Sequence, residues 1–443
     1  MAMGTKGTKG SSDPSAMARH SRESGNPAPL AFDSMKSLDP RLRGDDGNPS
    51  DPATSTALPR LRFPEFRGSG AWNLIKLGNV LKFQVGFPFP SKGFTEEGHG
   101  IRLIRNRDLR SNEKPIYYVD AYNADFVVFN GDILVGMDGD FTPCVWDGGD
   151  ALLNQRVGRV LPKAENHKRF LLYFLTAHLK AIEDSTARTT VKHLSHSDVE
   201  KICEPLPCGR EQQKIADCLT SLDEVIAAQG RKVEALKAHK RGLMQQLFPR
   251  EGETRPRLRF PEFRNELQWS TKGLGRLAKI QTGKKDANEG AIDGAYPFFT
   301  CAESHIYSHS YSFDAEAILI AGNANVGQTK YFKGKFEAYQ RTYVLTGFTG
   351  VLVPYLYEFL SANLPPALLV QVQTSAMSYI RLPMLEDFQV SIPSSLGEQQ
   401  RIADCLSSLD TRIAAETRQL TALKTHKHGL MQQLFPAPEA ASA

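Results

Sequence analysis

Basic and amide side chains gather in short stretches in two separate parts of this 443-residue chain. Four arginines fall within the segment IRLIRNRDLR (101–110), and Lys, Asn and Gln recur between residues 284 and 341. Arg and Lys suit guanine edges and phosphates, whereas Asn and Gln suit adenine edges. A single exposed arginine is usually only solvated, so the clustering in both parts carries the hypothesis of nucleic-acid recognition. The candidate contact residues are Lys92, Arg102, Arg105, Arg107, Arg110, Gln155, Arg156, Lys192, His193, Lys284, Lys285, His305, Asn323, Asn325, Gln328, Lys330, Gln340, Arg341, Tyr379 and Arg381.

Catalytic motifs are absent from the sequence. It has no GxxxxGK[ST] phosphate loop, no GxSxG nucleophile elbow and no His/Asp/Glu cluster with metal-ligand spacing. The stretch 322–327 (GNANVG) resembles a glycine-rich nucleotide loop, but no lysine-bearing helix follows it, so a turn is the better interpretation. We therefore predict that this chain has no catalytic residue, no metal and no cofactor of its own.

The composition of the chain indicates the cellular compartment of the protein more clearly than its function. None of the six cysteines forms a CxxC pair, which favours free thiols in a reducing compartment over a zinc site or a disulfide framework. The sequence contains no run of about 18 apolar residues, which a membrane-spanning helix would need. Its N-terminus has no apolar signal-peptide core. We expect a cytoplasmic protein. Its net charge of +5 permits a nucleic-acid partner without requiring one.

A scaffold must position the candidate contact residues. The clearest predicted element of that scaffold is a long helix that occurs twice. Residues 210–248 and 397–435 share the pattern EQQ(K/R)IADCL(T/S)SLD…GLMQQLF, at a constant offset of 187 positions. Apolar residues recur at steps of four and three, which is the spacing of a coiled-coil seam. Proline ends each stretch, at Pro249 and Pro436. A helix of this length extends for roughly 58 Å.

Each helix leaves an apolar seam that must be buried, and the other copy is the obvious partner. We predict an intramolecular antiparallel coiled coil whose register is marked by the polar breaks in the seam. Pairing Gln229 with Lys427 also pairs Lys240 with Glu416, because both pairs sum to the same number. The alternative is that each helix packs on its neighbouring globular domain and the sums agree by chance.

A second repeat frames the globular parts. The motif PRLRFPEFR occurs unchanged at 59–67 and 256–264, followed at the same offset of 197 by Trp72 and Trp269. The chain is therefore a tandem duplication of arm, globular unit and long helix. Strand-like runs such as 101–104 and 342–345 mix with helical stretches such as 169–182 without strict alternation, which predicts an α+β fold with pseudo-twofold repetition. The predicted boundaries are a disordered or spurious tail (1–57), globular unit 1 (58–208), the central helix (209–250), globular unit 2 (255–396), the C-terminal helix (397–436) and a short tail (437–443).

The twice-repeated PRLRFPEF…W…LG arm, followed by a variable unit and the EQQ(K/R)IADCL…GLMQQLFP helix, resembles the specificity subunit of type I restriction-modification systems. The resemblance extends from about residue 58 to the end of the chain, and the order of the paired repeats is highly specific. VGFPFPSKGF and RNRDL in unit 1 agree with it, as do TGKKDANEGAIDGAYPFFT and AILIAGNANVG in unit 2. The tail 1–57 departs from the family pattern.

The resemblance implies that each globular unit is a target recognition domain that reads one half of an asymmetric, bipartite DNA sequence. It implies that the two helices are spacers that set the gap and dock two modification (methyltransferase) subunits. Restriction subunits, which are translocases and endonucleases, would join that core. S-adenosylmethionine, ATP and Mg²⁺ would belong to these partner subunits, and this chain would be non-catalytic.

Other classes of function remain open on sequence alone. The chain could serve a related restriction system that lacks a translocating restriction subunit. It could be a nuclease or methyltransferase with built-in specificity, which methylation by the isolated chain would reveal. It could also be a coiled-coil scaffold whose heads bind something other than DNA, and this reading predicts no salt-sensitive DNA affinity.

Overall fold

The computed structural model describes residues 58–111, 113–163, 166–185, 193–250, 252–372 and 379–436. The predicted tails 1–57 and 437–443 and the candidate residue Lys192 lie outside these ranges. Within them the elements follow the order globular domain, long helix, globular domain, long helix. Residues 58–208 are called head 1 below, and residues 255–396 are called head 2.

Two 39-residue helices connect the heads: α4 (Gly209–Leu247) and α7 (Leu396–Leu434). Strong helix formers fill both, and no proline interrupts either. Each helix ends where a phenylalanine, Phe248 or Phe435, takes an extended conformation ahead of a proline. Sequence periodicity and the flanking prolines therefore account for both the existence and the length of these helices.

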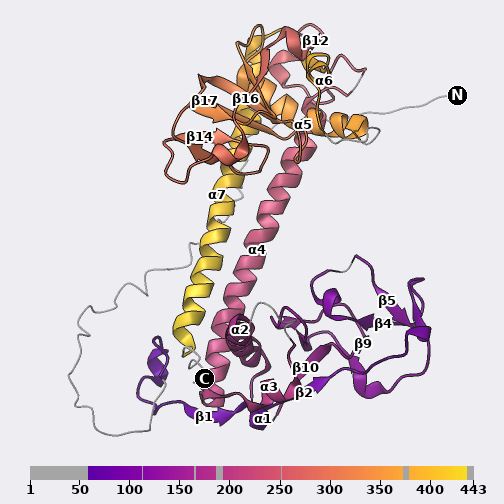
Figure 1. Ribbon diagram of the computed structural model, residues 1–443, viewed down its shortest axis with the longest axis vertical. Helices are drawn as coiled ribbons and strands as arrows, with labels where there is room; N and C mark the ends of the chain where they lie inside the picture. Colours follow the sequence, from indigo (N-terminus) through magenta and orange to yellow (C-terminus); the bar gives the residue numbers. More distant parts are fainter. Residues whose placement is uncertain are drawn as a thin grey trace, which may run out of the picture. The chain divides into compact units, whose positions relative to one another are not determined.

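Helices α4 and α7 lie side by side and run in opposite directions (Figure 1). Polar pairs between them join successively later residues of α4 to successively earlier residues of α7, as antiparallel packing requires. Between these pairs, buried and half-buried apolar residues line the middle of both helices. In order along α4, the pairs are Asp223–Lys427, Gln229–Glu416 and Lys240–Asp410.

The predicted pairing of the polar breaks is wrong. It placed Gln229 opposite Lys427 and Lys240 opposite Glu416, but Gln229 Nε2 donates to Glu416 Oε2 at 2.7 Å. Lys240 Nζ instead lies 2.5 Å from Asp410 Oδ2, and Lys427 makes the equivalent contact with α4. Long lysine stems can carry their ammonium groups along the helix surface to a carboxylate at the edge of the seam. Of the four polar breaks, Gln229 and Glu416 therefore face each other, while the two lysines pair with aspartates of the opposite helix.

Head 1 is built from short strands with helices packed against them. Its strands are β1 (Asn73–Lys76), β2 (Leu81–Val85), β3 (Phe94–Thr95), β4 (Ile101–Ile104), β5 (Ile116–Tyr118), β6 (Val127–Val128), β7 (Ile133–Gly136), β8 (Cys144–Val145), β9 (Ala151–Leu153), β10 (Val157–Pro162) and β11 (Cys203–Leu206). Its helices are α1 (Leu77–Val80), α2 (Lys168–Ser185) and α3 (His196–Lys201). One sheet has the order β2-β10-β7-β8 and a second has the order β3-β5-β4-β9-β6, while β1 and β11 pair in a separate ribbon.

Head 2 repeats this plan with a single larger sheet. Its strands are β12 (Ser270–Gly273), β13 (Lys279–Thr282), β14 (Tyr296–Phe299), β15 (Ile306–Ser308), β16 (Phe313–Ala321), β17 (Thr329–Ala338), β18 (Thr342–Thr346) and β19 (Gln389–Ile392), and its helices are α5 (Val353–Val372) and α6 (Leu382–Glu386). The sheet order is β13-β18-β16-β17-β14-β15, and β12 and β19 form the ribbon that corresponds to β1 and β11. Both heads mix helix and sheet, as the α+β prediction states.

The apolar core of each head includes the beginning of one long helix and the end of the other. Because α4 and α7 are antiparallel, the heads occupy opposite ends of the helix pair (Figure 1). Burial of these apolar side chains fixes each head to both helices, since removing apolar surface from water is the main stabilising term. The helix residues in the core of head 1 are Ile215, Ala216, Leu219 and Leu434, with Phe435 beyond the helix end. Those in the core of head 2 are Met244, Leu247, Ile402, Ala403 and Leu406, with Phe248 beyond the helix end.

The repeated PRLRFPEFR motif forms an arm that ties both helices together at each end. Arg62 Nε and Nη2 donate to the carboxylate of Glu211 at 2.8 and 2.7 Å, at the beginning of α4. The neighbouring Leu61 N–H donates to the carbonyl of Gln433 at 2.9 Å, at the end of α7. The unchanged motif is therefore explained by its contacts with two helix ends that are themselves repeated in the chain. The equivalent contacts in head 2 are Arg259–Glu398 and Leu258–Gln246.

Candidate nucleic-acid interface

In each head, three chain segments are joined by the same backbone hydrogen bonds. They are the loop after β7 or β16, the turn between β9 and β10 or between β17 and β18, and the stretch before α3 or α6. In head 1, Met137 N–H donates to Arg156 O at 3.1 Å, and Leu194 N–H donates to Met137 O at 2.8 Å. The corresponding bonds in head 2 are Gly322 N–H to Arg341 O (2.9 Å) and Ile380 N–H to Gly322 O (2.8 Å).

This shared frame establishes which residues of the two heads are structural equivalents. Each head has two polar residues on the loop, one directly after the bonded position and one two residues further on, together with one residue on the turn and one before the short helix. We call the set in head 1 loop cluster 1; it comprises Asp138, Asp140, Arg156 and His193. The set in head 2 is loop cluster 2; it comprises Asn323, Asn325, Arg341 and Tyr379. The frame is the same in both heads, and only the arginine is retained among the side chains that it presents.

The residue at the loop tip has a positive φ in both heads. Gly139 has φ = 80°, and Ala324, at the equivalent position, has φ = 55°. Ala324 is the one described non-glycine residue with positive φ. A left-handed conformation at alanine costs of order 1 kcal/mol or more, so the surrounding contacts must impose it. Such strain is typical of loops that hold side chains in place for a function.

Loop cluster 1 pairs a carboxylate with two cationic or ionisable side chains. Asp138 Oδ1 lies 2.9 Å from His193 Nδ1 and 3.4 Å from Arg156 Nη1. A side chain of the arginine-rich segment also holds the backbone of the loop, because Asn106 Nδ2 donates to the carbonyl of Asp138 at 2.8 Å. Cluster 1 therefore brings together two predicted contact residues, Arg156 and His193, and an aspartate that was not predicted.

A second ion pair extends loop cluster 1 toward the arginine-rich segment. Arg110 Nε donates to Asp140 Oδ2 at 2.8 Å, and Thr142 N–H donates to Asp140 Oδ1 at 2.9 Å. Burial acts to raise the pKa of Asp140, but the hydrogen bonds from Thr142 and Arg110 outweigh it and lower that pKa to about 2. Asp140 is therefore ionised at neutral pH, and it neutralises one of the four predicted arginines.

Loop cluster 2 has amides where cluster 1 has carboxylates. Asn325 Nδ2 donates to the carbonyl of Cys301 at 3.0 Å, which holds the loop in place. Asn323 is half-buried, while Arg341 and Tyr379 are exposed. Within the described residues, no side-chain ion pair engages Arg341, in contrast to Arg156. Its guanidinium is therefore available for an external acceptor such as a base edge or a phosphate.

The other predicted arginines of head 1 have partners inside the domain. Arg105 forms a bidentate pair with Asp108, at 2.7 and 2.8 Å, across the turn η4 (Asn106–Leu109). The Arg102 guanidinium lies 4.8 Å from the ring centre of Trp146. Arg107 is different, since its side chain is mostly exposed and its nearest carboxylate contact is 4.0 Å long. Intramolecular contacts therefore account for Arg102 and Arg105, and a role in DNA contact stays a prediction for all three.

Two predicted lysines of head 2 are also held by the domain. Lys285 Nζ donates to Ser308 and Ser310 at 3.0 and 2.6 Å, and it lies 3.7 Å from the buried carboxylate of Glu337. Lys330 Nζ donates to the carbonyl of Ala302, and burial lowers the pKa of Lys330. These contacts explain both lysines as stabilisers of head 2.

The remaining candidates lie at scattered positions. Gln340 Nε2 donates to Asp286 at 3.1 Å, beside the turn that carries Arg341. Gln328 Oε1 is buried and accepts no hydrogen bond from the described residues. The structure leaves the others exposed, without assigning them a common surface: Lys92, Gln155, Lys284, His305 and Arg381.

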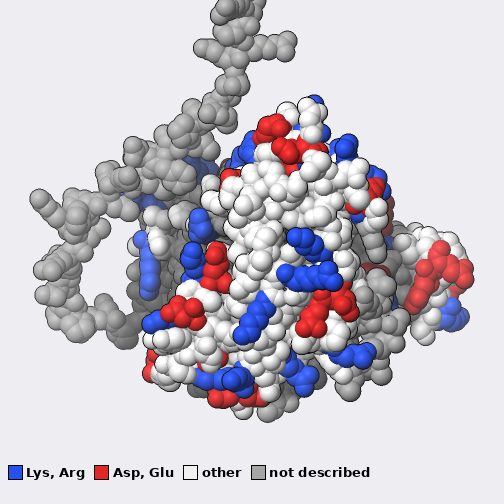
Figure 2. Space-filling view, turned by 90° about the horizontal axis from the view of Figure 1, so that it is seen from above, with Lys and Arg blue, Asp and Glu red and all other residues white. Residues whose placement is uncertain are grey.

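On the face that Figure 2 draws, positive and negative side chains are interspersed. Figure 2 shows Lys and Arg side chains interspersed with Asp and Glu among a majority of uncharged residues on one face. In the described ranges, no three His, Cys, Asp or Glu side chains lie close enough together to hold a metal ion. Among the described helices, none combines the length and the apolar character needed to cross a bilayer.

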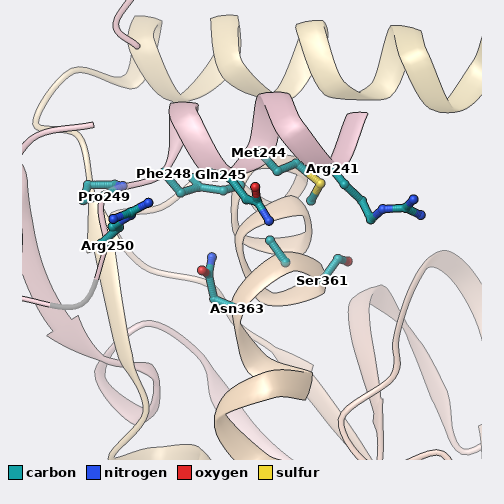
Figure 3. A pocket seen from close by; sticks show the side chains of 9 residues that line it. Arg241, Met244, Gln245, Phe248, Pro249, Arg250, Ser361 and Asn363 are labelled. Atoms are coloured by element: carbon teal, nitrogen blue, oxygen red, sulfur yellow. The ribbon is translucent and has the colours of Figure 1, made fainter. Parts of the chain in front are cut away.

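A pocket of about 480 Å³ lies where the end of α4 meets α5 (Figure 3). Gln245 from α4 and Asn363 from α5 extend into the same space, while Arg241 points away from them. None of the predicted contact residues lines this pocket. The pocket therefore belongs to the junction between head 2 and the helices, and it is separate in composition from loop cluster 2.

Residue-by-residue inspection of the sequence missed Asp138, Asp140 and Ala324. Residue type alone does not mark them, because an aspartate has the same charge sign as DNA and alanine has no polar group. A signal was nevertheless present: GMDGD (136–140) and GNAN (322–325) both follow an apolar strand, and Asp138 and Asn323 are 185 positions apart, close to the repeat offset of 187. Aligning the heads through the repeat would have revealed the matched loops.

Comparison with known proteins gives a consistent result. A family model described as the type I restriction modification DNA specificity domain matches residues 70–238 and 266–425. The type I restriction enzyme EcoDI specificity subunit of Escherichia coli is 40% identical over 154 residues, which is 35% of this chain and 34% of that protein. The MjaVIII specificity subunit of Methanocaldococcus jannaschii is 22% identical over 405 residues, covering 85% of this chain and 93% of that protein. The matched region thus spans about a third of the length of the E. coli relative.

Solved structures agree in fold. A type-I restriction-modification system S subunit from M. genitalium superposes with a TM-score of 0.58 at 17% identity, covering 85% of this chain and 99% of that chain. A chain from a structure described as the complex assembly and conformational transition of the type I R-M system superposes with a TM-score of 0.51 at 16% identity, covering 82% and 96% of the two chains. At these identities the structural likeness concerns the fold alone.

Proposed function

The chain belongs to the type I restriction modification DNA specificity family, and from this premise we propose that it is a non-catalytic DNA-recognition subunit. Head 1 and head 2 each read one half of an asymmetric bipartite target. Helices α4 and α7 form an antiparallel coiled coil with pseudo-twofold symmetry that sets the gap between the half-sites. One observation carries the proposal: the same three-segment frame presents different polar side chains in the two heads.

The difference between the loop clusters supports an asymmetric target. Base edges in the major groove are distinguished by their donors and acceptors, so a head that presents carboxylates and a head that presents amides favour different bases. Identical heads on a twofold frame would instead favour a palindrome. Since only the arginine is retained between the clusters, the two half-sites differ in sequence.

The dimensions of the helix pair support the role of spacer. A 39-residue helix extends for roughly 58 Å, and half-sites read from one side of B-DNA lie about 34 Å apart per helical turn. Each head is fixed to both helices at its own end of the helix pair. Buried apolar residues and the contacts Arg62–Glu211 in head 1 and Arg259–Glu398 in head 2 hold it there. Such attachment holds the two reading surfaces at a set distance.

The partners follow from the same family. We propose that the exposed faces of α4 and α7 dock two modification subunits, which carry S-adenosylmethionine and methylate the target. Restriction subunits that use ATP and Mg²⁺ complete the assembly. This chain supplies sequence recognition and geometry, and no step of the chemistry.

Selection from random duplex DNA tests the proposal directly. The chain is co-purified with its modification subunit, and bound sequences are recovered at two salt concentrations. We expect one gapped, asymmetric motif whose affinity falls as salt rises, because phosphate contacts release counterions. A complex that assembles but enriches no sequence would support the scaffold alternative. Methylation by the chain alone would support the alternative of an enzyme with built-in specificity.

A further inference from the structure

We propose that Asp138 and Asn323 are the matched base-reading positions of the two heads, a proposal that rests on the proposed function. Asp138 accepts a hydrogen bond from the exocyclic amino group of cytosine in the half-site of head 1. Asn323 makes a bidentate contact with adenine in the half-site of head 2. Both pairings follow from the hydrogen-bonding groups that these bases present in the major groove.

The backbone supports the equivalence of these two residues. Each is the residue directly after the loop position, Met137 or Gly322, that bonds the other two segments. Each also precedes the left-handed residue at the loop tip, Gly139 or Ala324. The frame therefore delivers one side chain to the same point in both heads and leaves its chemistry free to differ.

Two basic side chains next to Asp138 reduce the repulsion between its carboxylate and the DNA phosphates. A lone carboxylate near DNA would be repelled by the phosphates, but Asp138 has His193 at 2.9 Å and Arg156 at 3.4 Å from the same oxygen, Oδ1. The other oxygen, Oδ2, takes part in neither contact. The arginine reduces the local negative charge, and both contacts fix the carboxylate while one acceptor stays available.

Among the described residues, loop cluster 2 lacks the ion pairs that surround Asp138 in loop cluster 1. The amide of Asn323 is neutral and needs no counterion, and the position of His193 is taken by the uncharged Tyr379. Arg341 keeps the position of Arg156, but within the described part of head 2 no side-chain carboxylate holds it. The exchange of Asp for Asn is therefore accompanied by the loss of a second basic neighbour.

A purely structural role for Asp138 is less consistent with its surroundings. Its side chain is 30% exposed, and the partners of its carboxylate, Arg156 and His193, are about half exposed. By contrast, Asp108 and Asp132 are almost fully buried and bond the backbone of their own turns. Replacing Asp138 removes contacts at the surface and leaves the core of head 1 unchanged.

The test compares Asp138→Asn, Asn323→Asp and the control Asp147→Asn, each in the full chain co-purified with the modification subunit. Asp147 is exposed on head 1 and its replacement changes the charge equally. Motifs are determined by selection from random duplex DNA. For Asp138→Asn we expect the preference at one base pair of the head 1 half-site to change by roughly tenfold to a hundredfold. The gap and the other half-site stay the same. Asn323→Asp alters one base pair of the head 2 half-site, and Asp147→Asn alters none.

Two results would overturn this assignment. One is an unchanged motif for Asp138→Asn, and the other is an equal loss of affinity for every sequence. Thermal unfolding and assembly with the modification subunit are measured for each variant. If Asp138→Asn fails to fold, Asp138→Glu, which keeps the charge and moves the acceptor by one methylene, takes its place and must change the preference at the same base pair. If the unaltered chain enriches no gapped motif, the proposed function fails instead, so the two failures are distinguishable.

Discussion

Gln229 Nε2 donates a hydrogen bond to Glu416 Oε2 at 2.7 Å, and these two residues occupy the same position in the two copies of the helix. In an antiparallel pair of repeats, a residue can meet its own equivalent only at the centre of the pair. The flanking contacts Asp223–Lys427 and Lys240–Asp410 are exchanged by the same offset of 187. The centre of the helix pair is thus fixed by a polar contact with matched ion pairs on both sides.

Removing one heptad from each helix at this centre should shorten the gap in the DNA target. Deletion of 224–230 from α4 and 411–417 from α7 removes the central contact, and both flanking ion pairs keep their register. Seven residues correspond to about 10 Å of helix, so the gap should shorten by no more than about three base pairs. The methylated motif of the variant complex measures the change.

The matched control deletes 224–230 from α4 alone. That change shifts one helix against the other, so the two ion pairs can no longer form together, and we expect loss of the assembled complex. An unchanged gap in the double deletion, with methylation retained, would contradict the role of the helices as a spacer.

The sequence predicted the helices well because their information is local and repeated. Their limits follow from periodicity, from Pro249 and Pro436, and from an uninterrupted offset. The pairing of the polar breaks was predicted wrongly because its partners are not local. Lys240 contacts Glu358 of head 2 as well as Asp410, and no pattern within the helices contains that residue.

The candidate site was predictable in kind but not in arrangement. Arg156, His193 and Arg341 were expected from residue type, and the structure places them in equivalent clusters. Arg105 and Lys285 have the same chemistry, yet they satisfy Asp108 and Glu337 inside their own domains. Whether a basic side chain faces solvent or a buried carboxylate depends on the tertiary fold, which residue type does not specify.

Replacement of a turn residue should affect one half-site only. Arg341→Ala removes an exposed guanidinium from head 2, and Gln155→Ala removes an exposed amide from head 1. Each should lower affinity for its own half-site by roughly tenfold or more, since a base contact contributes about 1–3 kcal/mol. Binding to duplexes altered in one half-site at a time measures this. Equal weakening of both half-sites by either variant would contradict separate reading heads.

The arm contact should contribute strongly to stability. The Arg62 side chain is 10% exposed and that of Glu211 is 1% exposed. Arg62→Met leaves the Glu211 carboxylate buried without its partner, which should lower the free energy of unfolding by roughly 3–5 kcal/mol. Urea unfolding of the full chain measures the loss.

A matched surface pair on the same arm serves as the control. Lys214 and Glu65 form an ion pair at 3.0 Å whose side chains are both about half exposed. Water and salt screen such a pair, so Glu65→Gln should change stability little. Equal effects of the two variants would show that burial of the Arg62 contact is not its source of stability.

The junctions between heads and helices differ at one equivalent pair of residues, Tyr173 on α2 and Glu358 on α5. The Tyr173 hydroxyl donates to Asp223 at 2.7 Å, while Glu358 lies 2.8 Å from Lys240 Nζ. Asp410 shares that lysine with Glu358. Burial raises the pKa of Glu358 to about 7, against the opposing effect of Lys240 and with a further increase from Asp410.

This raised pKa predicts a pH-dependent stability at the head 2 junction. The ordinary pKa of glutamate is about 4.5, so below that pH the group is protonated in both folded and unfolded chains. As pH rises from about 4.5 through 7, the unfolded chain releases its proton first, and the folded state loses up to about 3 kcal/mol of stability.

Glu358→Gln removes this titrating group and keeps the shape of the side chain. We therefore expect the variant to gain stability over the unaltered chain at pH 8 and to gain much less at pH 5. Urea unfolding at both pH values measures the difference, and Tyr173→Phe, the matched change in head 1, should show no such pH dependence. A gain of equal size at both pH values would mean that Glu358 does not titrate in this range.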